Sequence, residues 1–119
     1  MDPSVLIVED EEVIRDVLVT VFGREGFGTR CAGSVAEAMA ELRTPPTHLT
    51  LDLHLPDGRG TEVLKRVREQ CPATKVAVTT GAIDRNLLAQ VTDLKPDGVF
   101  QKPFRASELV AWIRSHDPE

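Results

Sequence analysis

The feature that most constrains this fold is an alternation between short apolar runs and segments with helical spacing, repeated along the whole chain. The first run, residues 5–8, is continuously apolar, which is typical of a strand covered on both faces. Residues 14–22 then place apolar side chains at the spacing of one buried helix face. The same alternation predicts further strands at 27–32, 49–53, 76–79 and 98–100, and further helices around 35–42, 63–67, 87–91 and 109–113.

Residues that begin and end helices support these boundaries. Ser34 and Glu37 have capping-box spacing at the start of the second helical segment. Prolines at 45–46, 72 and 96 stand where the second, third and fourth helical patterns end. Alternating strands and helices imply a parallel sheet with helices on both faces. We therefore predict a five-stranded doubly wound α/β domain, with its functional site beyond the carboxyl ends of the strands.

Composition narrows the class of protein. The chain has 119 residues, which is the size of one domain, and its 14 basic and 19 acidic residues give a formal net charge of −5. An acidic chain is poorly suited to binding nucleic acid non-specifically. The sequence lacks both a long apolar stretch and a cationic leader, and two cysteines are too few for a disulfide scaffold. We expect a cytoplasmic domain that contacts no membrane.

Three acidic residues stand at the ends of predicted strands. Glu9 and Asp10 follow the first strand, and Asp52 stands at the end of the third. If those strands are neighbours, the three carboxylates converge, which is costly unless a cation is present. Mg²⁺ is the cation that best suits a few carboxylates and oxygen ligands. Two alternatives stay open: the first two acids cap a helix, and Asp52 forms a turn.

A hydroxyl and an ammonium group stand at the ends of the last two strands. Thr80 ends the fourth strand and Lys102 follows the fifth. Each is ordinary by itself. Together with the acids they supply what phosphoryl transfer to a carboxylate requires, namely a nucleophile, a metal site and fixed donors for phosphoryl oxygens.

The stretches 5–10, 52–60, 78–81 and 102–104 resemble, in this order, the receiver domain of two-component response regulators. The resemblance covers essentially the whole chain and implies a flavodoxin-like fold with strand order 2-1-3-4-5. It implies that Asp52 accepts a phosphoryl group from a sensor histidine kinase or a histidine phosphotransfer protein. The chain would then be a phosphoacceptor switch, assisting its own phosphorylation and dephosphorylation, rather than an enzyme.

The resemblance also assigns roles to individual residues. It implies Mg²⁺ bound by the carboxylates of Asp10 and Asp52, by Glu9 through a water, and by the backbone carbonyl of His54. It further implies that Thr80 and Lys102 contact the phosphoryl oxygens and that the bond between Lys102 and Pro103 is cis.

The sequence departs from the family at the position that usually carries a tyrosine or phenylalanine, where it has Val99. The aromatic Phe100 is one residue further on and should face the other side of the sheet. The family docks partners on the face made by the fourth helix, fifth strand and fifth helix. Trp112 is either an anchor on that face or a residue at the edge of the core. We assign no role to His48 or His116.

The output is not specified by this sequence. We expect residues 1–119 to form a single receiver domain, with 113–119 compatible with the start of a linker. The resemblance allows a homodimer on activation, and nucleic acid would be reached only through a separate output domain. The alternatives are a degenerate receiver that binds partners without phosphate, a flavin or nucleotide carrier, and an aspartyl-nucleophile phosphatase. Acids in place of a phosphate loop disfavour the carrier, and His54 in place of a second aspartate disfavours the phosphatase.

Overall fold

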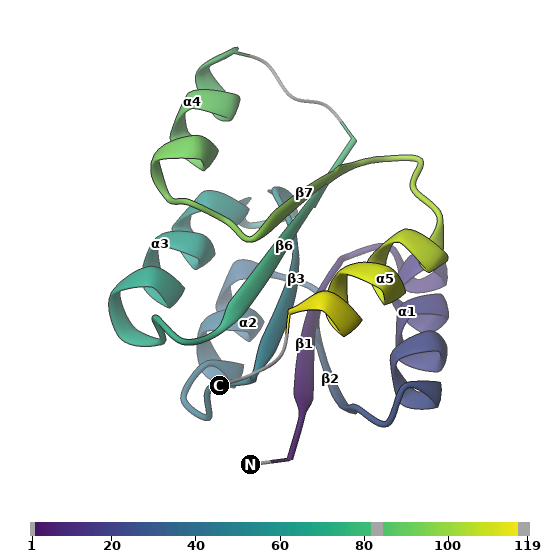
Figure 1. The fold of residues 1–119 in the computed structure, drawn as a ribbon. Coiled ribbons are helices and arrows are strands. Elements are labelled where there is room, and N and C mark those ends of the chain that lie inside the picture. Colours follow the sequence, from purple (N-terminus) through teal and green to yellow (C-terminus); the bar gives the residue numbers. More distant parts are fainter. Residues whose placement is uncertain (1, 82–84, 117–119) are drawn as a thin grey trace.

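A parallel sheet forms the centre of the computed structural model, which describes residues 2–81 and 85–116 (Figure 1). Its strands are β1 (Ser4–Val8), β2 (Gly28–Ala32), β3 (His48–Asp52), β6 (Lys75–Thr80) and β7 (Gly98–Gln101). They lie in the order β2-β1-β3-β6-β7, and every neighbouring pair is parallel. Counting these strands along the chain gives the predicted order 2-1-3-4-5, so the predicted fold is confirmed.

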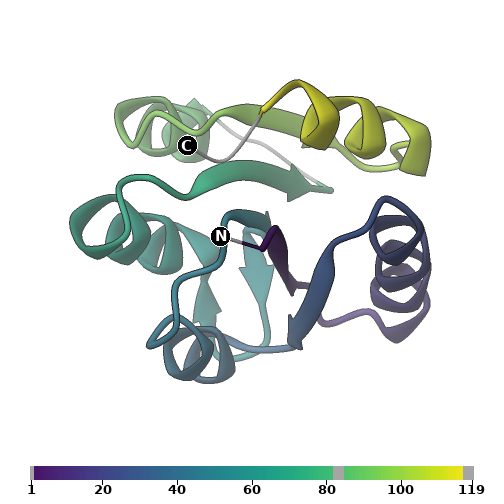
Figure 2. The ribbon, with the colours of Figure 1, turned by 60° about the horizontal axis from the view of Figure 1, so that its bottom comes forward.

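Helices cover both faces of the sheet (Figure 2). The helices are α1 (Glu12–Arg24), α2 (Val35–Glu41), α3 (Gly60–Gln70), α4 (Arg85–Asp93) and α5 (Ala106–Ser115). One layer packs Val5 and Ile7 of β1 against α1 and α5, while Leu6 and Val8 pack into the layer of α2, α3 and α4. Burial on both faces explains why the first run is continuously apolar. Among the described helices, none is long and apolar enough to cross a membrane.

A short hairpin between β3 and α3 was not predicted from the sequence. It pairs β4 (His54–Leu55) with β5 (Gly58–Arg59) in antiparallel register. Strands of two residues are too short to produce a hydrophobic pattern, so the segment reads as a loop. The hairpin begins two residues after Asp52 and ends at Arg59, immediately before α3.

The capping at the start of α2 differs in one respect from the predicted box. The Ser34 hydroxyl accepts a hydrogen bond from the Glu37 amide at 3.1 Å, as expected. The Glu37 carboxylate, however, accepts from the Gly33 amide at 2.6 Å, one residue further back than a capping box requires.

Trp112 packs at the edge of the core, which is the second of the two positions that the sequence left open. Its side chain is only 6% exposed, and its ring meets the rings of His48 and His116 at centroid distances of 5.8 and 5.1 Å. His48 is fully buried on β3, and its Nε2 contacts the carbonyl oxygen of His116. These two histidines, to which the sequence assigned no role, hold the last turn of α5 against the sheet.

Candidate functional site

Three carboxylates meet at the carboxyl ends of β1 and β3. Val8 pairs with Leu51 across the two strands, so Glu9 and Asp10 leave β1 beside Asp52. One oxygen from each of these acids lies within 4.8 Å of the others. Glu9 and Asp52 are buried, whereas Asp10 is exposed. The convergence follows directly from the order of the strands.

Lys102 places an ammonium group among these acids. Its Nζ lies 3.0 Å from Asp52 Oδ2 and 2.8 Å from Glu9 Oε1. Burial alone would lower the pKa of Lys102, but its hydrogen bonds with Glu9 and Asp52 outweigh burial and raise it, which keeps the ammonium charged. The peptide bond between Lys102 and Pro103 is cis.

Glu9 is the most deeply buried of the three acids. Burial raises the pKa of Glu9 above its usual value, and the neighbouring Asp52 carboxylate acts in the same direction, although Lys102 and the Glu11 amide oppose both. Its Oε2 accepts from the Glu11 amide at 3.1 Å. Apart from the ion pair with Lys102, Glu9 Oε1 has no hydrogen-bond partner among the described residues. This oxygen therefore has capacity for a further cation.

The backbone around Asp52 is held by close packing. Its Oδ1 accepts a hydrogen bond from the His54 amide at 3.0 Å. Gly60 passes so near that a Cβ there would lie 2.3 Å from the Asp52 carbonyl oxygen and 2.7 Å from Leu53 Cα. Both contacts are with backbone, so a side chain at this position would displace Asp52 itself. The Gly60 amide also donates to the Leu53 carbonyl at 2.9 Å.

Thr80 joins the site through the sheet. It is the last residue of β6 and is fully buried, and its carbonyl accepts from the Lys102 amide at 2.6 Å. The backbone therefore ties the threonine to the lysine, so that neither can shift along the strands without the other. Strand register thus brings both predicted donors to the end of the sheet where the acids lie.

The other predicted residues are placed differently. The His54 side chain is exposed, and its amide rather than its ring contacts Asp52. Val99 is 44% exposed on β7 and is not part of the acid cluster. Phe100 packs into the layer of α1 and α5, on the side expected from strand alternation.

Arg15 contributes to the site and was not identified from the sequence. Its Nη1 donates to the carbonyl oxygen of Glu9 at 3.2 Å, which orients the segment that carries the first two acids. An arginine on an amphipathic helix gives no signal of this kind, because a backbone carbonyl partner leaves no mark in the sequence.

The chemistry of these donors fits a hard divalent cation. The carboxylates of Glu9, Asp10 and Asp52 are close enough to share one ion, and carboxylate oxygens are the ligands that Mg²⁺ prefers. Lys102 offsets only part of their charge. The site therefore combines a nucleophilic carboxylate, a place for a cation and a fixed ammonium donor.

The sequence matches the response regulator receiver domain family over residues 5–114. The chain belongs to this family. Curated relatives of the receiver domain include the photosynthetic apparatus regulatory protein RegA of Rhodovulum sulfidophilum, 40% identical over 117 residues, and the sensory transduction protein RegX3 of Mycolicibacterium smegmatis, 38% identical over 115 residues. The alignments cover 97% and 94% of this chain, but 63% and 49% of those proteins. The receiver domain thus spans about half to two thirds of the length of these relatives.

Solved structures share the fold of this receiver domain. A CheY-like receiver domain protein from Methanospirillum hungatei superposes with a TM-score of 0.91 at 24% identity, covering 97% of this chain and 93% of that one. A response regulator from Burkholderia pseudomallei superposes with a TM-score of 0.85 at 24% identity, covering 94% and 66%. The latter structure contains a phosphorylated aspartic acid, a calcium ion and citrate. Receiver domains are signalling phosphoacceptor domains, and this chain has that architecture throughout.

Proposed function

We propose that this receiver domain is the phosphoacceptor switch of a two-component system, with Asp52 as the residue that is phosphorylated. One observation carries the proposal: Asp52 is buried beside Glu9 and Asp10, with Lys102 Nζ 3.0 Å from its Oδ2. A buried carboxylate with a nearby cation site and a fixed ammonium is the arrangement that phosphoryl transfer to an acid requires. The donor would be the phosphohistidine of a sensor kinase or of a histidine phosphotransfer protein.

In the transfer step, a carboxylate oxygen of Asp52 forms a bond to phosphorus as the bond from phosphorus to the histidine nitrogen breaks. The imidazole nitrogen keeps the electron pair of that bond and the ring takes up a proton from solvent, so the histidine leaves as neutral imidazole. When bound, Mg²⁺ would neutralise charge on the transferring phosphoryl group. The carboxylates of Asp10 and Asp52 and the carbonyl of His54 would hold it directly, and Glu9 would hold it through a water.

Lys102 and Thr80 would donate to the phosphoryl oxygens. Lys102 Nζ is shared between Asp52 and Glu9, so it can turn toward a phosphoryl group on Asp52 without leaving the site. Thr80 is tied to it through the backbone hydrogen bond between them. A change at one donor therefore reaches the ends of β6 and β7, which suits a switch that alters a surface rather than a metabolic catalyst.

A groove beside the site supports a protein as the phosphoryl donor. It has a volume of about 590 Å³ and lies between α1 and the segment 102–106. Apolar residues line most of it, including Val13, Val17 and Phe104, and the Val13 side chain is 77% exposed. A partner that brings a histidine to Asp52 would cover these side chains. Since sensor kinases present that histidine in the cytoplasm, we expect the domain to act there.

The proposed output surface comprises α4, β7 and α5. Leu88 and Val99 are large apolar residues exposed on α4 and β7. Because this receiver domain, taken as residues 1–119, spans only part of its relatives' length, we propose that it controls an output domain, through which any contact with nucleic acid would be made. A homodimer formed on this surface after phosphorylation fits the same proposal.

Phosphorylation by acetyl phosphate tests the proposal. With Mg²⁺, the parent should gain one acid-stable, base-labile phosphoryl group by intact-mass measurement, and EDTA should prevent this. Asp52→Asn should abolish the adduct, whereas Asp16→Asn, a change at an exposed aspartate of α1, should not. The full adduct on Asp52→Asn would exclude Asp52 as the acceptor, and a parent that never gains the group would favour the degenerate receiver.

A further inference from the structure

The hairpin that follows Asp52 is fastened to a helix from a distant part of the chain. Asp57 lies in its turn, and its carboxylate accepts two hydrogen bonds from the start of α2: Val35 N to Oδ1 at 2.7 Å and Ala36 N to Oδ2 at 3.0 Å. Both hydrogen bonds lower the pKa of Asp57, and the bond from the Val35 amide lowers it more than the bond from the Ala36 amide. The carboxylate is therefore ionised when it caps the helix.

Asp57 complements the local capping of α2 rather than repeating it. The next amide, that of Glu37, is already satisfied by Ser34, which belongs to the same turn. The bonds made by Ser34 are confined to α2, whereas those of Asp57 cross 21 and 22 positions of sequence. Asp57 thus joins two segments that the chain could otherwise move independently.

Both joined segments lead to the acid cluster. On one side, the carbonyl oxygen of Ala32, at the end of β2 just before α2, accepts a hydrogen bond from the Glu9 amide at 2.9 Å. On the other side, the hairpin donates from the His54 amide to Asp52 Oδ1 at 3.0 Å. The start of α2 is therefore a bridge between the loop that carries Glu9 and the loop that carries Asp52.

We propose that Asp57 is a positioning residue for the metal and phosphoacceptor site. This inference rests on the proposed function. By fixing the hairpin to α2, Asp57 sets where the Asp52 carboxylate and the His54 carbonyl stand relative to Glu9 and Asp10. Its loss would leave every ligand in place but less well ordered. Residues that orient metal ligands without touching the metal typically change affinity by about 10-fold to 100-fold.

The hairpin would remain folded without this carboxylate. A Cβ at Gly58 would lie 3.3 Å from Val35 Cγ2, which shows how closely the turn already packs on α2. Leu55 belongs to the same buried cluster as Val35. Apolar packing therefore keeps the hairpin on the helix, while Asp57 fixes its orientation.

The test compares Asp57→Ala with Ser34→Ala, which removes a cap from the same helix end without touching the hairpin. The first readout is the Mg²⁺ dissociation constant by calorimetry with no phosphodonor present. The second is the Mg²⁺ concentration that gives half-maximal phosphorylation by acetyl phosphate. Asp57→Ala should raise both about 10-fold. Ser34→Ala should leave both close to the parent values, although each variant lowers the melting temperature.

Asp57→Asn provides a graded variant, and serves in place of Asp57→Ala if the latter does not fold. Its amide oxygen can accept one of the two backbone hydrogen bonds, so its Mg²⁺ affinity should fall between those of the parent and Asp57→Ala. Equal Mg²⁺ affinities in Asp57→Ala and Ser34→Ala would overturn the inference and leave the proposed function standing. A parent that neither binds Mg²⁺ nor accepts phosphate would overturn the proposed function itself.

Discussion

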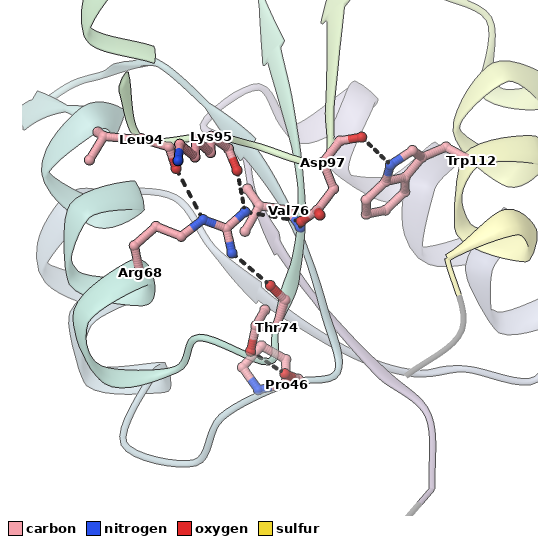
Figure 3. Close-up of polar contacts among 8 residues, drawn as sticks. All are labelled: Pro46, Arg68, Thr74, Val76, Leu94, Lys95, Asp97 and Trp112. Atoms are coloured by element: carbon pink, nitrogen blue, oxygen red, sulfur yellow. Dashed lines mark hydrogen bonds and ion pairs between the residues drawn. The ribbon is translucent and has the colours of Figure 1, made fainter. Parts of the chain in front are cut away.

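The two ends of the parallel sheet hold their charges in different ways. At the carboxyl ends of the strands, the ammonium of Lys102 serves both Asp52 and Glu9, and Asp10 adds a third carboxylate to the cluster. At the amino ends of β6 and β7, the guanidinium of Arg68 donates to four acceptors (Figure 3). These are the carbonyls of Leu94, Thr74 and Lys95, at 3.1, 3.1 and 2.8 Å, and Asp97 Oδ2 at 3.0 Å.

The comparison separates a responsive end from a fixed one. Carboxylates outnumber the ammonium in the acid cluster, so a cation or a phosphoryl group changes its energy strongly. In the Arg68 network, Asp97 Oδ2 also accepts a hydrogen bond from the Val76 amide at 2.7 Å. The backbone carbonyl of Asp97 accepts a hydrogen bond from Trp112 Nε1 at 3.4 Å. Arg68 thereby secures the loop after α4, so we expect phosphorylation to move the start of α4 rather than its end.

The largest effect on stability should come from removing the Arg68 hydrogen bonds at the amino ends of β6 and β7. Arg68→Ala leaves Asp97 and three carbonyls without a charged donor, so it should lower the free energy of unfolding by about 3 kcal/mol in urea denaturation. Phosphorylation of Asp52 should persist in the folded variant. Arg66→Ala, at an exposed position of the same helix, should cost far less. Equal losses in the two variants would show that the Arg68 network is not what holds this end.

Removing a charge from the acid cluster should stabilise the metal-free protein, whereas removing Arg68 should destabilise it. Asp10→Asn relieves repulsion and should raise the free energy of unfolding in EDTA by about 1 kcal/mol. Saturating Mg²⁺ should stabilise the parent, by about 2.7 kcal/mol at 100 times the dissociation constant, and should stabilise the variant less. Thermal melts with and without Mg²⁺ measure both effects. A variant that melts below the parent in EDTA would contradict the repulsion on which the comparison depends.

A smaller effect should appear as pH dependence at Asp57. Because the folded-state pKa is lowered, its stabilisation is complete above the unfolded-state value, near 3.8, and is lost as the pH falls through the folded-state value. The parent should therefore be more stable than Asp57→Asn at neutral pH, and the two should converge in acid. Ser34→Ala should keep the pH dependence of the parent. Parallel curves for the parent and Asp57→Asn would argue against an ionised cap.

The smallest effect is expected at Val99. Valine is β-branched and stiff, and it lacks the aromatic ring that the family usually carries at this position, so it should carry no signal. Amide resonances of residues 85–91 should shift when beryllofluoride binds, and they should shift similarly in Val99→Ala. Loss of these shifts in Val99→Ala, with beryllofluoride still bound, would show that β7 transmits the change after all.

The acid cluster could be predicted from the sequence because its residues stand at the ends of strands or directly after them. Once apolar runs identify the strands, the rule that sites lie beyond their carboxyl ends places Glu9, Asp52 and Lys102 together. The layered fold was predictable for a similar reason, since continuous apolar strands must be covered on both faces. Both predictions needed only local patterns.

The fixed end could not be predicted, because its acceptors are mostly backbone carbonyls. Arg68 looks like any arginine on an amphipathic helix, and nothing in the sequence marks Leu94 or Lys95 as its partners. The Asp57 cap was missed for the same reason, since its donors are amides more than 20 residues away. The sequence left the burial of Trp112 open, because spacing alone does not show how deeply a helix face is buried.

The position of Trp112 has a consequence for optical experiments. It is the chain's only tryptophan, and it contacts His48, the first residue of the strand that ends at Asp52. Asp52 lies four positions further along this strand than His48, which is a distance of about 13 Å. Its emission will therefore follow unfolding of α5 from the sheet, and it will be a weak indicator of events at the acids. A magnesium titration followed by intrinsic fluorescence should look nearly flat even as the ion binds, so a probe attached near the carboxyl ends of the strands is the better choice.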